Sequence, residues 1–151
     1  MNTCKTCELT AKRDLGHAPL WDCIYRGQHW DVVHSYNSSL AGWLVLVARR
    51  HRAAVADLTP DEAVECGILL RQVSIALQKV IGCAKTYVIQ FAEHPDHPHV
   101  HFHIVPRMSD QPADRRAMGI FAYLGVSEEE RVSEVQMNEI AQQVRDILLQ
   151  M

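Results

Sequence analysis

A run of alternating histidines is the feature that most constrains the fold of this chain. His97, His99, His101 and His103 occupy every second position of the segment 97–107. In a β-strand, side chains at every second position share one face of the sheet. The residues between the histidines from position 100 on are β-forming and apolar: Val100, Phe102, Ile104 and Val105. The pattern predicts a strand that turns imidazoles to one face and apolar side chains into a core.

Neutral imidazoles in a row have several chemical uses. They can position a phosphate, relay protons, attack phosphorus or bind a metal. The chain has nine histidines among 151 residues, so a solvent-facing polar stripe that arose by chance is the alternative. An unbroken alternation on a β-pattern favours a functional site.

Length and composition are those of an ordinary globular protein. A chain of 151 residues can form one sizeable core, so we expect a single domain over residues 1–151. Hydrophobic residues make up 48% of the chain, and a net charge of −3 gives no reason to expect nucleic-acid binding. No apolar run approaches the roughly 18 residues of a membrane span, and the N-terminus has no apolar signal region. We therefore expect a cytoplasmic protein without a membrane partner.

Five segments have the composition of strands. Residues 93–98, which connect the last two of them, can hardly be a central strand because they include Pro95 and Pro98. The predicted strands are Trp21–Tyr25, Trp30–Tyr36, Trp43–Val47, Lys85–Ala92 and His99–Val105.

Helices are predicted between and after these strands. Thr59, Pro60 and Glu62 form the start of a long helix, with a capping box and proline at its first position, and Gly82 ends it. A last helix is expected from about 133 to 149, and residues 1–16 form a short polar helix or turn. This order predicts an α+β fold: a mainly antiparallel sheet with a long helix packed on it, plus a C-terminal helix. Residues 107–127 are expected to be irregular.

The five cysteines fall into two groups. Cys23, Cys66 and Cys83 stand alone in apolar contexts and are typical of small core residues. Cys4 and Cys7 form a C-x-x-C pair, a spacing that is compatible with half of a zinc site but is a weak signal alone. A redox pair or simple surface residues are the other interpretations, and the redox pair would need a βαβ context that the sequence lacks.

Residues His99–Val105 match the H-φ-H-φ-H-φ-φ motif, with φ apolar, of the histidine triad family, which the chain resembles. The following Pro106 and Arg107 also fit the hydrolase branches of that family. Upstream, residues 42–51 resemble its Gly-x-φ-Leu-Val strand with the basic and histidine element that follows, and the helix beginning near Leu58 is in the place of its long helix. The resemblance covers roughly residues 20 to 107, so 107–151 is a C-terminal extension.

The resemblance implies a nucleotidyl hydrolase that acts at the α-phosphate of a dinucleoside polyphosphate or a nucleoside phosphoramidate. By motif position His101 is the nucleophile that forms a covalent nucleotidyl-histidine, with His103 and His99 as further catalytic residues. The family's transferase branch has Gln at position 103, so His103 favours water as the second substrate. An attacking imidazole must donate its other N–H to an acceptor, and a backbone carbonyl or carboxylate can serve.

Substrate contacts are less well defined by the motif. The family's Gly-Gln-Ser/Thr element is replaced here by residues 94–96, so His94, Asp96 or His97 are candidates to take over its phosphate contacts. Ser35 aligns with the family's nucleoside-contacting residue, and the neighbouring Asn37 is a second candidate. Two basic groups could attract phosphates or form a solvated face: Arg107, and the cluster of Arg49, Arg50 and Arg52.

Some members of the family carry an N-terminal C-x-x-C, and this resemblance implies structural zinc. The implied ligands are Cys4, Cys7, His51 and His99, with His97 as the alternative fourth ligand, and residues 1–16 form the zinc-binding segment. If His99 binds zinc, it supports His101 and is not a catalytic acid. The resemblance also implies a homodimer through the long helix and the adjacent strand, and we expect the apolar segment 118–124 to pack over the active site or the partner chain.

Two other functions remain open. A metal-binding module could use the histidine row and the cysteine pair without catalysis, although His101 and His103 would then have no role. A nucleotide-binding interaction protein without turnover would use the same pocket as an enzyme.

Overall fold

The computed structural model describes residues 3–151, and residues 1 and 2 of the predicted N-terminal segment lie outside this range. Three α-helices and five strands form the framework. The helices are α1 (Lys5–Asp14), α2 (Pro60–Ile81) and α3 (Glu134–Leu149). The strands are β1 (Tyr25–Arg26), β2 (Trp30–His34), β3 (Leu44–Ala48), β4 (Lys85–Ile89) and β5 (His101–Arg107). None of the helices described is both long and apolar enough to cross a membrane.

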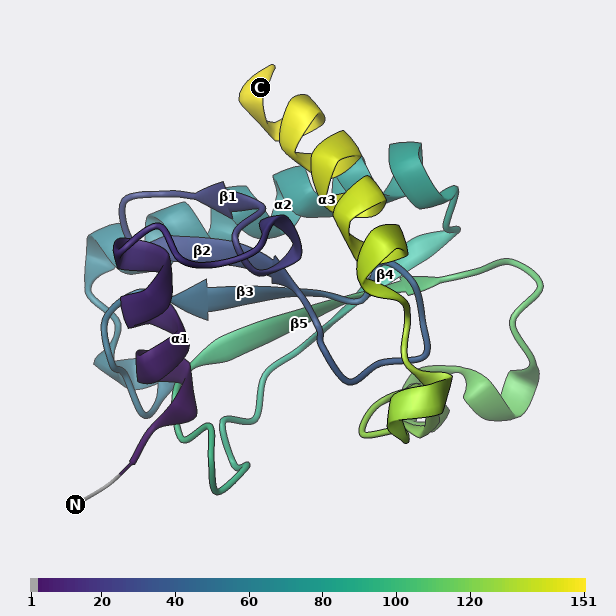
Figure 1. Ribbon diagram of the computed structural model, residues 1–151, viewed down its shortest axis with the longest axis horizontal. Helices are drawn as coiled ribbons and strands as arrows, with labels where there is room; N and C mark the ends of the chain where they lie inside the picture. The colour runs from purple at the N-terminus through teal and green to yellow at the C-terminus, as the bar shows by residue number, and fades with distance from the viewer. Residues whose placement is uncertain (1–2) are drawn as a thin grey trace.

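The strands form one antiparallel sheet in the order β1-β2-β3-β5-β4 (Figure 1). This confirms the predicted α+β fold with an antiparallel sheet. The histidine strand β5 lies between β3 and β4, and Val45 pairs with His103 while Val47 pairs with His101. The register brings the histidines beside the small apolar side chains of β3.

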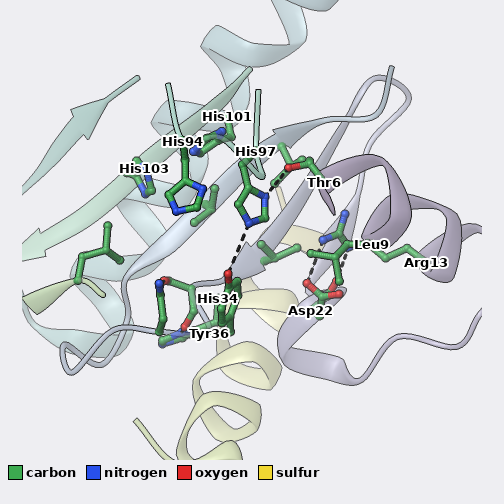
Figure 2. A pocket seen from close by; sticks show the side chains of 16 residues that line it. Thr6, Leu9, Arg13, Asp22, His34, Tyr36, His94, His97, His101 and His103 are labelled. Carbon is green, nitrogen blue, oxygen red and sulfur yellow. Dashed lines mark hydrogen bonds and ion pairs between the residues drawn. The ribbon is translucent and has the colours of Figure 1, made fainter. Parts of the chain in front are cut away.

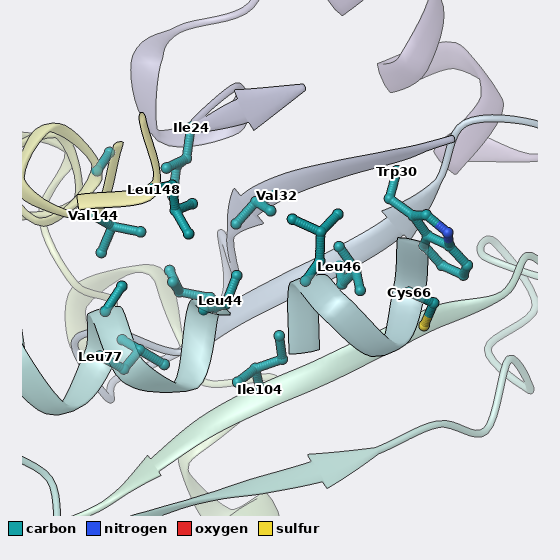
Figure 3. Packing of buried hydrophobic residues seen from close by; sticks show 14 of the residues in the cluster. Ile24, Trp30, Val32, Leu44, Leu46, Cys66, Leu77, Ile104, Val144 and Leu148 are labelled. Atoms are coloured by element: carbon teal, nitrogen blue, oxygen red, sulfur yellow. The ribbon is translucent and has the colours of Figure 1, made fainter. Parts of the chain in front are cut away.

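The sheet separates two apolar clusters. Alternate residues of β2, β3 and β5 pack against α2 and α3 on one face (Figure 3), among them Val32, Leu46 and Ile104. The intervening residues, such as Val33 and Val45, belong to a smaller cluster on the other face. This alternation leaves the second face, which α2 and α3 do not cover, available for a binding site.

The long helix begins and ends as predicted. The Thr59 side chain accepts from the Glu62 backbone N–H while the Glu62 carboxylate accepts from the Thr59 N–H, and Pro60 occupies the first helical position. Gly82 follows in the left-handed conformation at φ 74°, which glycine adopts without steric cost. The apolar stripe of α2, which includes Leu69 and Val73, is buried against the sheet.

The prediction of a strand over Trp21–Tyr25 is wrong. Leu20–Asp22 form a single 3₁₀ turn, and pairing with β2 begins only at Tyr25. The reason is a long-range contact: the Trp21 backbone N–H donates to the Asn138 side chain of α3, 3.0 Å away. This segment is therefore bonded to the C-terminal helix α3 and does not pair with the sheet.

The bounds of the other four predicted strands also differ from those observed, and the strand predicted over Trp43–Val47 runs from Leu44 to Ala48. The strand predicted over Trp30–Tyr36 ends at His34, and the one predicted over Lys85–Ala92 ends at Ile89. Ala92 has a positive φ of 56°, which a strand cannot contain. The histidine strand predicted over His99–Val105 runs instead from His101 to Arg107.

The segment after β5 is a series of 3₁₀ turns, and the longest covers Ala117–Tyr123. Ile120 in this turn is fully buried against the second face of the sheet, whereas Met118 is exposed. The α3 helix returns to the opposite face, where Val144 and Leu148 complete the main core. The C-terminal extension thus contributes to both faces.

Candidate functional site

The free face of the sheet forms one wall of a pocket of about 170 Å³ (Figure 2). Its other walls come from α1, from the loop before β5 and from the segment after β2. The polar and charged lining residues are Thr6, Arg13, Asp22, His34, Ser35, Tyr36, Asn37, His94, His97, His101 and His103, and the apolar ones are Leu9, Val33, Val45, Val47 and Leu124.

His101 is held in one tautomer by the backbone. Its Nδ1 lies 2.7 Å from the carbonyl oxygen of His99, and a carbonyl can only accept, so Nδ1 carries the proton. The other nitrogen, Nε2, is then unprotonated and has a free lone pair. Burial lowers the pKa of His101 below its usual value, which keeps the ring neutral. Of the two kinds of acceptor that the sequence left open, the structure has a backbone carbonyl, and His101 has the properties of a nucleophile.

His103 is held in the opposite tautomer. The indole N–H of Trp43 donates to its Nδ1 at 3.0 Å, and because an indole can only donate, Nδ1 is unprotonated and Nε2 carries the hydrogen. Burial lowers the pKa of His103 to about 4. The rings of His101 and His103 lie 5.0 Å apart, centroid to centroid. A nucleophilic nitrogen and a hydrogen-bond donor thus stand side by side.

A third imidazole, His97, lies in the pocket next to α1. Its Nδ1 is 2.7 Å from the hydroxyl of Thr6, and its Nε2 is 3.4 Å from the Tyr36 hydroxyl. In Figure 2, His97 lies between His101 and Thr6, with His103 on the far side of His101. The centroids of the His97 and His101 rings are 6.5 Å apart.

The side chain of His99 does not line this pocket. It is fully buried, and its Nε2–H donates to the Ala48 carbonyl at 2.6 Å, which leaves Nδ1 as a lone pair. That lone pair points to Cys4, Cys7 and His51, and the ligand atoms of these four residues all lie within 4.8 Å of one another. The structure brings together all four residues that the resemblance named as metal ligands, whereas His97 lies in the pocket.

The spacing of the four ligand atoms fits a zinc ion. Bonds of about 2.0 Å to nitrogen and about 2.3 Å to sulfur in a tetrahedron place two nitrogens about 3.3 Å apart and nitrogen and sulfur about 3.5 Å apart. Here Nδ1 of His51 and Nδ1 of His99 are 3.1 Å apart, and three of the four sulfur-to-nitrogen distances are 3.3, 3.5 and 3.6 Å. Burial and the neighbouring Cys4 raise the pKa of the Cys7 thiol to about 11, so a cation is needed to hold this sulfur as a thiolate at neutral pH.

A buried ion-pair cluster holds the other end of α1. The Arg13 guanidinium contacts the Asp22 carboxylate at 2.9 Å and the Asp31 carboxylate at 3.5 Å, and all three side chains are almost completely buried. Arg26 also contacts Asp31, at 2.8 Å. Helix α1 is therefore fixed to the sheet at its second end as well.

The predicted substrate residues divide into two groups. Ser35, Asn37 and His94 line the pocket, and the Ser35 hydroxyl donates to the Asn37 side chain at 3.1 Å. Asp96 and Arg107 do not line it: Asp96 is exposed, and Arg107 ends β5 opposite Lys85 at the far side from His101.

The basic cluster also lies outside the pocket lining. Arg49 is 3.6 Å from Asp14 and Arg52 is 3.0 Å from Glu62, whereas Arg50 is exposed. The charges of Arg49 and Arg52 are therefore paired with carboxylates of the protein itself.

Sequence reasoning missed Trp43, Thr6 and Tyr36. The pairing of Val45 with His103 places Trp43 next to His103, so a correct strand register would have revealed this contact. No local signal indicates the contact between Thr6 and His97, which are 91 positions apart.

Comparisons of the sequence with protein-family models and with curated proteins find no match. Solved structures do match in fold. A hypothetical histidine triad nucleotide-binding protein from Sulfolobus tokodaii has a TM-score of 0.70 at 10% identity, over 95% of this chain and 93% of that one. A Zn-bound histidine triad family protein from Mycobacterium smegmatis has a TM-score of 0.66 at 16% identity, over 97% and 94% of the two chains.

A third similar structure is the diadenosine triphosphate hydrolase of Plasmodium falciparum in complex with cyclomarin A. Its TM-score is 0.63 at 15% identity, and the match covers 84% of this chain and 76% of that one. Together with the sheet order and the His99–His103 motif, these similarities show that the chain has the fold of the histidine triad proteins.

Proposed function

We propose that this protein is a hydrolase that acts at the α-phosphate of a nucleotide, in a phosphoanhydride or phosphoramidate bond. The observation that carries the proposal is the pair of opposite tautomers at His101 and His103. One ring offers a lone pair to phosphorus, and the other offers an N–H to a phosphate oxygen. A metal-binding module would need neither arrangement.

In the first step, Nε2 of His101 forms a bond to phosphorus. The bond between phosphorus and the leaving group breaks, and its electron pair goes to the leaving oxygen or nitrogen. A leaving nitrogen also takes up a proton from solvent, so that it departs as a neutral amine or ammonia. The imidazole becomes cationic, and the His99 carbonyl stabilises this charge by accepting the Nδ1–H. The Nε2–H of His103 is placed to hold a non-bridging oxygen, where charge must be stabilised in phosphoryl transfer.

In the second step, water attacks the nucleotidyl-histidine. The new bond is between the water oxygen and phosphorus, and the phosphorus–nitrogen bond breaks with its electron pair returning to Nε2. One water proton is released to solvent, and a nucleoside monophosphate leaves. We place the nucleoside against Ser35 and Asn37, whose side chains can hydrogen-bond a ribose.

We further propose that Cys4, Cys7, His51 and His99 hold a zinc ion. Two sulfurs and two nitrogens complete a tetrahedron, so the ion would have no open position for substrate and would act only as a structural cross-link. It would fasten the first turn of α1 to the end of β3 and to the start of β5. His99 would then support the nucleophile through its carbonyl and would not act as a catalytic acid.

A homodimer is the proposed assembly. Strand β4 is at one end of the sheet, with Val88 47% exposed, and Val64 and Ile68 of α2 are 63% and 52% exposed. Apolar side chains of this kind on a long helix and an edge strand favour pairing with a second copy. We also propose a cytoplasmic location, since the five cysteines, all among residues 3–151, form no disulfide bond.

The test is the release of nucleoside monophosphate, measured by chromatography with diadenosine triphosphate and with adenosine 5′-phosphoramidate. We expect release by the wild type and a loss of at least about 1,000-fold in His101→Ala, because removing the nucleophile abolishes the covalent path. A covalent adenylyl adduct at His101, found by mass spectrometry after rapid quenching, would support the mechanism. If the zinc-loaded wild type binds both compounds without turnover, the protein is a nucleotide-binding interaction module instead.

A further inference from the structure

The first turn of α1 contributes to the pocket as well as to the metal-ligand group. Thr6, between Cys4 and Cys7, is buried, with its hydroxyl 2.7 Å from Nδ1 of His97. The Lys5 backbone N–H donates to the Asp96 carbonyl at 2.9 Å. The loop that precedes the histidine strand is therefore docked on this turn.

The Lys5 side chain lies at the rim of the same region. Its ammonium is 5.1 Å from the centre of the Tyr36 ring, and the Tyr36 hydroxyl is 3.4 Å from Nε2 of His97. His94 stands on the other side, with its ring centroid 5.5 Å from that of His97. Four hydrogen-bonding side chains thus line the pocket on this side of His101, and the ammonium of Lys5, which is exposed and outside the lining, lies beside one of them, Tyr36.

This side of the pocket is opposite His103. Figure 2 shows His97 and Thr6 on the α1 side of His101, and His103 on the other side. If the phosphate oxygens are held by His103 and the nucleoside by Ser35 and Asn37, the group that leaves phosphorus has the α1 side available to it.

The charges of this region favour an anion. Asp22 is the one acidic residue among those that line the pocket, and its carboxylate is paired with Arg13 at 2.9 Å. The Asp96 carboxylate is exposed outside the lining. An ammonium group leaving from phosphorus would find no free carboxylate among these lining side chains, whereas a phosphate would find Lys5 and the N–H or O–H groups of its neighbours.

We propose that Lys5 and Thr6, together with His94, His97 and Tyr36, form a subsite for an anionic phosphate leaving group. The inference rests on the proposed function and narrows it: the protein prefers a phosphoanhydride over a phosphoramidate. Lys5 contacts the departing phosphate, and Thr6 is a positioning residue that acts through His97. Helix α1 then contributes residues that select the leaving group, in addition to residues that would bind the metal.

The kinetic test compares two substrates that give the same adenylyl-histidine. Diadenosine triphosphate breaks a phosphorus–oxygen bond and releases ADP, whereas adenosine 5′-phosphoramidate breaks a phosphorus–nitrogen bond and releases ammonia. The values of kcat/KM report the first step, in which the two differ. In Lys5→Met, we expect the ratio of kcat/KM for the triphosphate to that for the phosphoramidate to fall about fivefold, as for an exposed charge contact.

The matched control is Lys12→Met, the same change on an exposed lysine about two turns further along α1, away from the Tyr36 ring that Lys5 contacts. It should leave the ratio at the wild-type value. For Thr6, the ratio should fall about tenfold in Thr6→Val, which loses the hydrogen bond to His97, and should recover in Thr6→Ser, which keeps the hydroxyl. Equal losses for both substrates, or an unchanged ratio in Lys5→Met, would overturn the inference.

A binding measurement separates this inference from the proposed function. Calorimetry with His101→Ala as the background compares diadenosine triphosphate with AMP, which lacks the leaving group. Adding Lys5→Met should raise the dissociation constant of the triphosphate about fivefold and that of AMP less than twofold. If the wild type turns over neither substrate, the proposed function fails, and these dissociation constants still decide whether the subsite exists: equal weakening of both ligands, or of neither, would rule it out.

Discussion

At the scale of single residues, the site depends on which ring nitrogen carries each proton. A carbonyl fixes the proton of His101 on Nδ1, and an indole excludes it from Nδ1 of His103. These partners are unambiguous because one can only accept and the other can only donate. The histidines therefore have different roles although the sequence motif repeats the same residue.

The contact of Trp43 with His103 gives a residue-scale prediction. In Trp43→Phe, His103 loses the donor that selects its tautomer, so we expect kcat/KM to fall about tenfold, the effect of one lost hydrogen bond. Nitrogen NMR of the imidazoles should show a mixture of tautomers at His103 and one at His101. Trp21→Phe, outside the pocket lining, is the control. A wild-type spectrum in Trp43→Phe would show that the indole does not select the tautomer.

Burial of neutral histidines also predicts how stability depends on pH. Burial lowers the pKa of His34 to about 4, and its ring donates to the Ser35 carbonyl and accepts from the Gly42 N–H. The unfolded chain, in which histidine has a pKa of about 6.5, takes up this proton first. The contribution to stability is therefore full above about pH 6.5 and is lost as the pH falls towards 4.

The measurement is the free energy of unfolding in urea at pH 7.5 and pH 4.5. In His34→Gln the difference between the two values should be smaller than in the wild type, because the titrating group is gone. Both proteins should be studied with a chelator present, so that metal release does not add to the difference. Equal differences would indicate that His34 is protonated in the folded state.

At the scale of elements, α1 is attached to the domain at both ends. At its start, Cys4 and Cys7 belong to the proposed metal-ligand group, and its last turn is held by the buried Arg13 cluster. The helix has little apolar surface of its own, since its three buried residues, Thr6, Thr10 and Arg13, are all polar or charged. Polar contacts, together with the proposed metal site, therefore replace hydrophobic packing here.

Removal of the metal should loosen α1 selectively. We expect Cys7→Ser to bind less than a tenth of the wild-type zinc, measured by elemental analysis, because a tetrahedral site loses affinity strongly with one ligand. Hydrogen exchange should then become faster in the amides of α1 but not in those of β3. Cys23→Ser is the control, since Cys23 is outside the ligand group. Uniform acceleration over the whole chain would mean that α1 is not a separate unit.

Patterns within elements were predictable and contacts between them were not. The alternation in the histidine strand and the caps of α2 are local, and both are visible in the sequence. The start of β5 was misplaced by two residues because His99 is used by the metal-ligand group, with its carbonyl directed to His101. The 3₁₀ turn at Leu20 and the Thr6–His97 pair depend on partners more than 90 positions away, which no local pattern encodes.

At the scale of the whole molecule, the two faces of the sheet have separate tasks. Helices α2 and α3 complete the main core on one face, and the histidines, α1 and the 3₁₀ turn of Ala117–Tyr123 surround the other. The expectation that segment 118–124 packs over the site has structural support, because Ile120 is buried on this face and Leu124 lines the pocket. The edge strand β4 and the outer side of α2 remain exposed.

This exposed side predicts the assembly. In Ile68→Glu, a charge placed in the proposed contact should convert a dimer into a monomer, with the molar mass from light scattering falling to about half. Val135→Glu is the matched control, since Val135 is 69% exposed on α3 and lies outside the proposed contact. A wild-type protein that is already monomeric at micromolar concentration would refute the proposed dimer.

The carbonyl of His99 makes the orientation of the nucleophile independent of the side chain at position 99. Every amino acid has a backbone carbonyl, so a different residue at position 99 would still offer an acceptor to the imidazole of His101, provided that the chain keeps its path. The side chain of His99 completes the metal-ligand group, whereas the atom that orients His101 belongs to the backbone. A single substitution at this position can therefore remove a metal ligand and leave the acceptor of His101 in place.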